Sequence, residues 1–84
     1  MKKTNQASTA RNLIGGRVRQ ARVKCVPPVS QEDLAGRLAT HRVALDRSAI
    51  SRIENGDRYL MDYEIAAIAK CLRVSVAWLF GEAR

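Results

Sequence analysis

The 84-residue chain lacks the long apolar runs that would place it in a membrane. No window approaches the ~18 apolar residues that a transmembrane helix requires. The first residues, Met1, Lys2 and Lys3, carry charge as a signal peptide does, but polar residues follow where its apolar region would lie. We therefore expect a cytoplasmic protein with no membrane-spanning segment.

Cysteine and histidine are also scarce, with two cysteines and one histidine in the chain. A structural zinc ion needs four ligands, so these residues argue against a metal site. Cys25 and Cys71 occur where helical periodicity favours a small apolar residue, and without secretory features both are expected to stay reduced. His41 is expected at the surface or in a turn. The sequence thus indicates neither a metal nor a cofactor.

Aromatic residues make up 5% of the chain, which is too few for a protein that stacks the bases of single-stranded RNA. The sequence has no nucleophile paired with a base, no cluster of carboxylates and no glycine-rich phosphate loop, so we do not expect an enzyme. Hydrophobic residues reach 46% and charged residues 27%, a balance typical of a globular protein. The length allows one small domain.

Positive charge is what the chain has in excess, with a net charge of +7. Residues 1–42 contain nine basic and two acidic side chains, a surplus of seven, whereas residues 43–84 contain six of each. Nucleic acid is the obvious polyanion, because neutralising phosphates releases condensed counterions and so drives association. Charge alone also fits a solvated basic surface, so the partner must be identified from motifs.

A first helix is predicted to begin near Asn12, whose side chain favours a cap position. Its apolar residues recur at helical spacing and are Ile14, Val18, Ala21 and Cys25. Pro27 and Pro28 prevent this helix from continuing. We expect residues 1–11 to be a flexible basic tail, residues 12–81 the folded domain and residues 82–84 a carboxyl-terminal tail.

A second helix is predicted to start at Ser30 or Gln31, because Ser30 and Asp33 have the spacing of a capping box. Its apolar positions are Leu34, Ala35 and Leu38. Residues 39–45 contain neither glycine nor proline, so they could form an extra helical turn or an irregular loop.

A third, short helix is predicted from Arg47 to Glu54, with Asp46 as its cap and Gly56 suited to a left-handed conformation after its end. A fourth helix should begin near Asp62; its apolar stripe consists of Ile65, Ile68, Ala69 and Leu72. A brief fifth helix should follow a cap at Ser75. No alternating strand pattern is present, so the expected fold is all-α, a compact domain of five helices.

The polar side of the third helix has the features of a base-reading surface. Arg47, Ser48, Ser51 and Arg52 lie on one face, opposite the apolar residues Ala49, Ile50 and Ile53. A helix of two or three turns fits the major groove, and arginine can make two hydrogen bonds to guanine. Arg47 and Arg52 are therefore the first candidates for base contacts.

The segment from Gln31 to Gly56 resembles the phage repressor and Cro family of helix-turn-helix regulators, also called XRE-type. The resemblance is carried by Gln31, Leu34 and Ala35 followed by Ile-Ser-Arg-Ile-Glu-Asn-Gly at residues 50–56. Further similar positions are Ile14, Gly15, Val18, Arg19, Arg22, Ala69, Lys70, Leu72, Val74 and Ser75. The resemblance implies a repressor-like fold whose second and third helices form the helix-turn-helix.

The resemblance also implies roles for individual residues. Gln31, at the amino end of the second helix, should hold a phosphate and brace a side chain of the third helix. Arg22 should form an ion pair with Glu54 behind the third helix. The full set of expected DNA-binding residues is Gln31, Arg42, Arg47, Ser48, Ser51, Arg52, Asn55 and Arg58.

The chain departs from the family pattern at two informative points. The spacing between Ala35 and Ile50 is longer than usual, which enlarges the connection inside the helix-turn-helix. Arg73 occupies a position where the family often has glycine, so we expect a left-handed arginine there at some energetic cost.

The expected function is sequence-specific binding of double-stranded DNA by a small transcriptional regulator, most simply a repressor. A homodimer on a palindromic operator is expected, because two recognition helices ~34 Å apart can read two half-sites. Tyr59, Leu60 and Tyr63 could form the contact or pack on the fourth helix; Trp78, Leu79 and Phe80 could form it or belong to the core. The alternative is an antitoxin or another interaction protein whose main partner is a protein.

Overall fold

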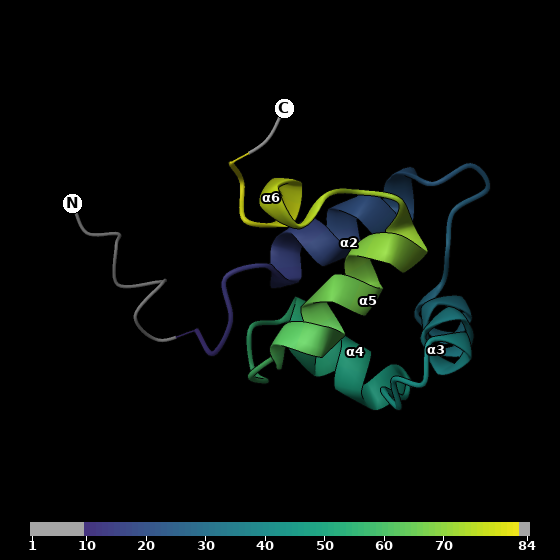
Figure 1. Ribbon diagram of the computed structural model, residues 1–84, viewed down its shortest axis with the longest axis horizontal. Helices are drawn as coiled ribbons and strands as arrows, with labels where there is room; N and C mark the ends of the chain where they lie inside the picture. Colours follow the sequence, from purple (N-terminus) through teal and green to yellow (C-terminus); the bar gives the residue numbers. More distant parts are fainter. Residues whose placement is uncertain (1–9, 83–84) are drawn as a thin grey trace.

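The computed structural model describes residues 10–82, which form five α-helices and no β-strand. The helices are α2 (Gly15–Lys24), α3 (Gln31–Thr40), α4 (Arg47–Glu54), α5 (Asp62–Leu72) and α6 (Val76–Leu79), all labelled in Figure 1. The all-α prediction is confirmed. Lys2, Lys3 and most of the two expected tails lie outside the described residues. Arg11, which we expected in the first tail, is attached to the domain because its amide donates a hydrogen bond to the Gly56 carbonyl at 2.8 Å.

Short polar side chains begin three of the helices as predicted. Ser30 and Asp33 form a capping box, in which Ser30 Oγ accepts from the Asp33 amide at 2.9 Å and the Ser30 amide donates to Asp33 Oδ2 at 3.1 Å. The bond from the Ser30 amide is the main reason why the pKa of the Asp33 carboxyl lies below its ordinary value. Asp46 and Ser75 accept from the Ala49 and Trp78 amides and cap α4 and α6.

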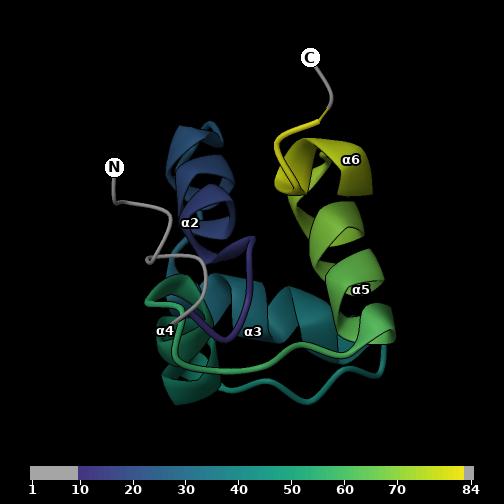
Figure 2. The same ribbon diagram turned by 90° about the vertical axis from the view of Figure 1, so that its left-hand side faces the viewer.

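The predicted apolar stripes meet in one core. The fully buried large side chains come from every helix or its first flanking residue; they are Ile14, Val18, Leu34, Leu38, Ile50, Ile53, Ile68 and Leu79. Helix α4 packs against α2 and α3, while α5 packs against α2, α3 and α6. Figures 1 and 2 show α3 and α4 together at one end of the molecule and α6 at the other. Helices α2 and α5 thus pack against the core-facing sides of α4 and α3, the two helices of the predicted helix-turn-helix.

The enlarged connection of the motif is partly helical and mostly irregular. Helix α3 continues through Thr40, and residues 41–46 then form a turn and an extended stretch. Val43 and Leu45 are buried while Ala44 between them is exposed, as expected for extended backbone with alternating side chains. These two apolar anchors attach the longer connection to the core.

The residue after α5 has the expected left-handed backbone. Arg73 has φ 58° and ψ 41°, a conformation that costs an arginine roughly 1–2 kcal/mol relative to the right-handed region. Its amide donates to the Lys70 carbonyl at 3.2 Å, and the Val74 amide donates to the Ala69 carbonyl at 3.1 Å, so the last turn of α5 is closed.

Both cysteines are free thiols. Cys71 is buried, and burial raises the pKa of its thiol; Cys25 is half-buried at the end of α2. His41 is exposed directly after α3, as predicted. Residues 10–82 contain no cluster of three metal-ligating side chains, and no helix in this range is long and apolar enough to cross a membrane.

Candidate nucleic-acid interface

Helix α4 has two sides of opposite character. Ala49, Ile50 and Ile53 are buried against the core. On the other side Arg47, Ser48 and Arg52 are exposed, and Ser51 is half-buried. This division follows from the helical repeat, since residues that share the core face recur every three or four positions. The polar side chains of α4 therefore face solvent.

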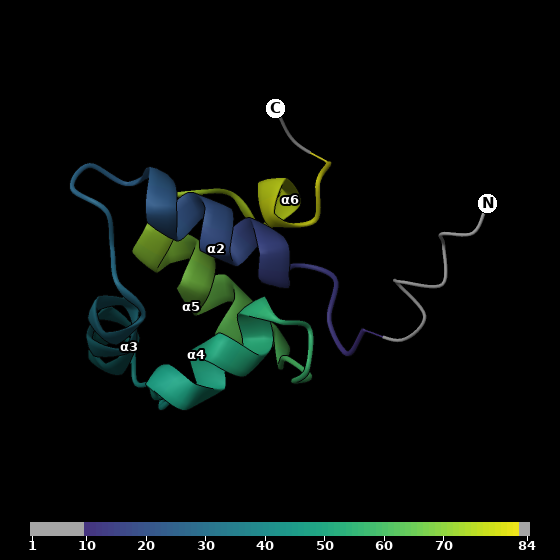
Figure 3. The same ribbon diagram turned by 180° about the vertical axis from the view of Figure 1, so that it is seen from behind.

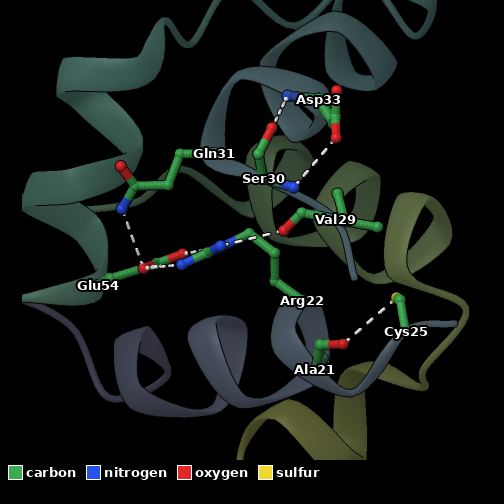
Figure 4. A network of polar contacts seen from close by, with 8 residues as sticks. All are labelled: Ala21, Arg22, Cys25, Val29, Ser30, Gln31, Asp33 and Glu54. Carbon is green, nitrogen blue, oxygen red and sulfur yellow. Dashed lines mark hydrogen bonds and ion pairs between the residues drawn. The ribbon is translucent and has the colours of Figure 1, made fainter. Parts of the chain in front are cut away.

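A buried carboxylate holds the end of α4 against α2 and α3 (Figure 4). Glu54 Oε2 accepts from Arg22 Nε at 2.8 Å, and Glu54 Oε1 accepts from Arg22 Nη2 at 2.9 Å. The side chains of Arg22 and Glu54 are only 13% and 4% exposed. The predicted ion pair is confirmed, and the hydrogen bonds from Arg22 to Glu54 raise the pKa of the Arg22 guanidinium.

The same network includes the start of α3. Arg22 Nη1 donates to the Val29 carbonyl at 3.0 Å, just before the α3 cap. Gln31 Nε2 donates to Glu54 Oε1 at 3.1 Å, so Gln31 braces a side chain of α4 as the resemblance implied. The Glu54 carboxylate bonds to side chains of both α2 and α3. It therefore fixes the orientation of the carboxyl end of α4 relative to these two helices.

Helix α4 lies between two hollows. One has a volume of about 560 Å³ and brings Gln31 and Arg47 together; it is lined by Arg22, Ser30, Gln31, Glu32 and Arg47. The other, of about 630 Å³, lies between α3, the enlarged connection and α4, and Arg52 and Arg58 are among its lining residues. Predicted site residues thus line both hollows, with Gln31 and Arg47 at the first and Arg52 and Arg58 at the second.

Three of the predicted site residues lie outside α4 in the sequence and do not belong to its exposed polar side. Asn55 is exposed directly after the helix, and Arg42 is exposed in the enlarged connection with φ 62°. Arg58 is half-buried and pairs with the buried Glu64, with Nη1–Oε1 at 3.1 Å and Nη2–Oε2 at 3.4 Å. Its guanidinium also donates to the Tyr59 carbonyl at 2.9 Å. Arg58 therefore neutralises a buried carboxylate inside the domain.

Asn12 has a positioning role that its place in the sequence does not indicate. The structure corrects the predicted start of the first helix, because α2 begins at Gly15 with Ile14 at the cap position. Asn12 lies two residues before that position, and its Oδ1 accepts from the Ile14 and Gly15 amides at 3.1 and 2.7 Å. Its Nδ2 also donates to the Ile53 carbonyl at 3.1 Å and to the Arg58 carbonyl at 2.9 Å. Asn12 thereby links the start of α2 to the last turn of α4. Its type and place near a helix start signal only the cap; the second contact depends on how α2 and α4 meet.

Replacing Glu54 with Gln should lower the free energy of unfolding by about 1.5–3 kcal/mol, because the charge-assisted hydrogen bonds with Arg22 are lost. Urea denaturation followed by circular dichroism measures this change. Glu82→Gln is the matched control, since Glu82 is exposed after α6 and should shift stability by less than about 0.5 kcal/mol. Equal stability of the two variants would show that the carboxylate of Glu54 does not stabilise the motif.

Comparison with known families also identifies a helix-turn-helix in this chain. A helix-turn-helix family model matches residues 29–79, from the residue before the α3 cap to the end of α6. The match spans more than half of the chain and includes α3 and α4, with Gln31 and Glu54 of the network but not Arg22. Neither a curated protein nor a solved structure matches the chain significantly. The chain is a member of the XRE-type helix-turn-helix family of DNA-binding regulators.

Proposed function

We propose that this regulator binds a specific double-stranded operator by inserting α4 into the major groove, and that it represses transcription by occupying that site. The exposed polar face of α4, held from behind by the Glu54 network, is the observation that carries this proposal. A rigidly held short helix with outward arginines matches the dimensions and the hydrogen-bonding groups of the major groove.

The side chains of α4 have distinct proposed roles. Arg47 and Arg52 read bases, because each guanidinium can donate two hydrogen bonds to the O6 and N7 atoms of guanine. Ser48 and Ser51 contact a base, a phosphate or a bridging water molecule at the same groove. These four residues determine which sequence is bound.

Residues next to α4 hold the DNA backbone in this proposal. Gln31 lies at the amino end of α3, where free amides and the helix dipole favour a phosphate oxygen. Asn55 and Arg42 are exposed on either side of α4 in the sequence and are assigned to phosphates. Arg58 is assigned to a phosphate as well, with its guanidinium also paired with Glu64.

A palindromic operator and a homodimer complete the proposal. A single short helix contacts few base pairs, so one copy provides limited specificity. Two copies related by a two-fold axis place their α4 helices ~34 Å apart and read two half-sites together. Such a protein acts in the compartment that contains the DNA, which for a bacterial or phage regulator is the cytoplasm.

Selection of bound duplexes from a random pool tests this function directly. We expect one recurrent motif, arranged as two inverted half-sites, and an affinity that decreases steeply as salt increases because phosphate contacts release counterions. The selected operator should bind about 10³-fold or more tightly than random duplex at physiological salt. A pool that shows no enriched motif after selection would contradict sequence-specific binding.

A further inference from the structure

A cavity at the junction of α2, α3 and α5 is lined by both cysteines of the chain. It has a volume of about 360 Å³, and its other lining residues are Arg37, Arg73 and three apolar residues. Figure 3 shows the carboxyl ends of α2 and α5 side by side, with α3 below them in this view. We refer to this feature as the thiol cavity. Its volume is within the range of pockets that hold small molecules, and its lining includes none of the residues proposed to contact DNA.

The two thiols of the cavity differ in accessibility. Cys71 is 7% exposed, and burial raises the pKa of its thiol, so this thiol stays protonated near neutral pH. Cys25 is half-buried at the carboxyl end of α2, where its Sγ donates to the Ala21 carbonyl at 3.3 Å (Figure 4). A thiol is a weak hydrogen-bond donor, so this contact can open at little cost. Cys25 is therefore the thiol that can react with a molecule in the cavity.

Positive charge is concentrated at the same cavity. Arg37 of α3 and Arg73 after α5 both line it, and no carboxylate of the described residues does. Arg37 Nη1 donates to the Cys71 carbonyl at 3.1 Å, which holds its guanidinium at the cavity. Within residues 10–82 neither arginine takes part in an ion pair. Because a guanidinium binds a carboxylate through paired hydrogen bonds, the two arginines favour an anionic ligand.

Arg73 keeps its side chain at an energetic cost. Its left-handed backbone, with φ 58°, costs an arginine roughly 1–2 kcal/mol, which a glycine would avoid. Residues strained in this way cluster at functional sites. A guanidinium that binds a ligand in the thiol cavity gives a physical reason for an arginine at this position.

From these observations we infer that the thiol cavity is a modification site, in which Cys25 reacts with small disulfides whose halves carry carboxylates. The Cys25 thiol loses its proton to solvent, and the thiolate attacks one sulfur of the disulfide. A bond forms between Cys25 Sγ and that sulfur, the original S–S bond breaks, and the other half leaves as a thiolate. The disulfide is the oxidant in this exchange. Arg37 and Arg73 bind the carboxylate of the half that stays.

The experiment compares the reaction of two disulfides with the reduced full chain. Dithiobisnitrobenzoate carries a carboxylate on each half, whereas dithiodipyridine is uncharged at neutral pH, and absorbance measures the thiol that each releases. Peptide mass spectrometry locates the adduct. Cys25→Ser and Cys71→Ser identify the reacting thiol.

Three substitutions test the cations. Arg37→Gln and Arg73→Gly each remove one positive charge from the cavity, and glycine suits the left-handed backbone at position 73. Lys70→Gln is the matched control, because Lys70 is an exposed cation of α5 that does not line the cavity. If Arg37→Gln does not keep the circular dichroism spectrum of the unchanged protein, Arg73→Gly decides the result.

We expect rapid release of one equivalent of thiol, with the adduct on Cys25. Cys25→Ser should abolish the rapid release, and Cys71→Ser should retain it. With dithiobisnitrobenzoate, Arg37→Gln and Arg73→Gly should each lower the second-order rate constant about fivefold or more, because cations accelerate the approach of an anion. Their rate constants with dithiodipyridine, and both rate constants of Lys70→Gln, should change less than about twofold.

Several results would overturn the inference. An adduct on Cys71, or an internal bond between Cys25 and Cys71 in place of the adduct, would show that Cys25 is not the modified residue. Equal losses in Lys70→Gln and the arginine variants would show that the cavity has no special charge. Arginine variants that slow both disulfides alike would show that these cations do not select an anion. DNA takes no part in these measurements, so their outcome is independent of the proposed function.

Discussion

Replacing Arg47 or Arg52 with Ala is expected to weaken binding to the selected operator about 10- to 100-fold, and binding to random duplex only about two- to fivefold. Both side chains are exposed on α4, and among the described residues neither guanidinium takes part in an ion pair or a side-chain hydrogen bond. Each is therefore free to donate two hydrogen bonds to a guanine. Loss of such a pair removes about 1–3 kcal/mol of discrimination at one base pair.

Fluorescence anisotropy with labelled duplexes at one fixed salt concentration measures both affinities. Lys70→Ala is the control, because Lys70 is an exposed cation on α5 and its removal changes the net charge by the same amount. The control should weaken both duplexes slightly and equally. If an α4 variant loses the same factor on the operator and on random duplex, its arginine contacts phosphate and does not read a base.

Replacing Gly15 with Ala is expected to destabilise the domain by about 3 kcal/mol, the upper part of the range for overpacked sites. A Cβ atom at Gly15 would collide with the Ile53 carbonyl oxygen and would lie 3.1 Å from the Glu54 carbonyl oxygen. Both are backbone atoms of the last turn of α4, so they cannot move aside as a side chain does. Helix α4 would have to shift away from α2, which would strain the pair of Arg22 and Glu54.

Gly16→Ala is an unusually close control, because the two glycines are adjacent in α2. A Cβ atom at Gly16 meets nothing within 4 Å, and the helix gains about 0.5–1 kcal/mol when glycine is replaced by alanine. The two variants should therefore move the urea midpoint in opposite directions. A Gly15→Ala protein as stable as Gly16→Ala would mean that α2 and α4 do not approach as closely as described.

The capped helices were predictable because their determinants lie within a few residues. Ser30 with Asp33, and Asp46 before Arg47, each satisfy backbone amides of their own first turn. The helix from Arg47 to Glu54 was expected with the same bounds that the structure has. The face that α4 turns to solvent was predictable for the same reason, since the helical repeat alone separates Ile50 and Ile53 from Arg47 and Arg52.

Longer-range pairings could be expected only through the resemblance to a family. Nothing in the spacing of Arg22 and Glu54 shows that they meet, yet the resemblance implied the pair and the structure contains it. Arg58 illustrates the limit of this reasoning. Its place among the DNA-binding residues stays a prediction, whereas its pairing with the buried Glu64 was not expected, because that pairing depends on the path of residues 57–64 in three dimensions.

The helices, the caps of α3, α4 and α6, the apolar faces and the excess of positive charge can thus be derived from the order of the residues alone, because they depend on interactions over about four residues or on composition. Three other features become visible only in the folded molecule: the course of residues 41–46 through buried Val43 and Leu45, the contact of Gly15 with the end of α4, and the meeting of Leu13, Tyr59 and Phe80 around one hollow. These features join residues far apart in the chain, and their positions follow from how whole helices fill a common core, which no local pattern specifies.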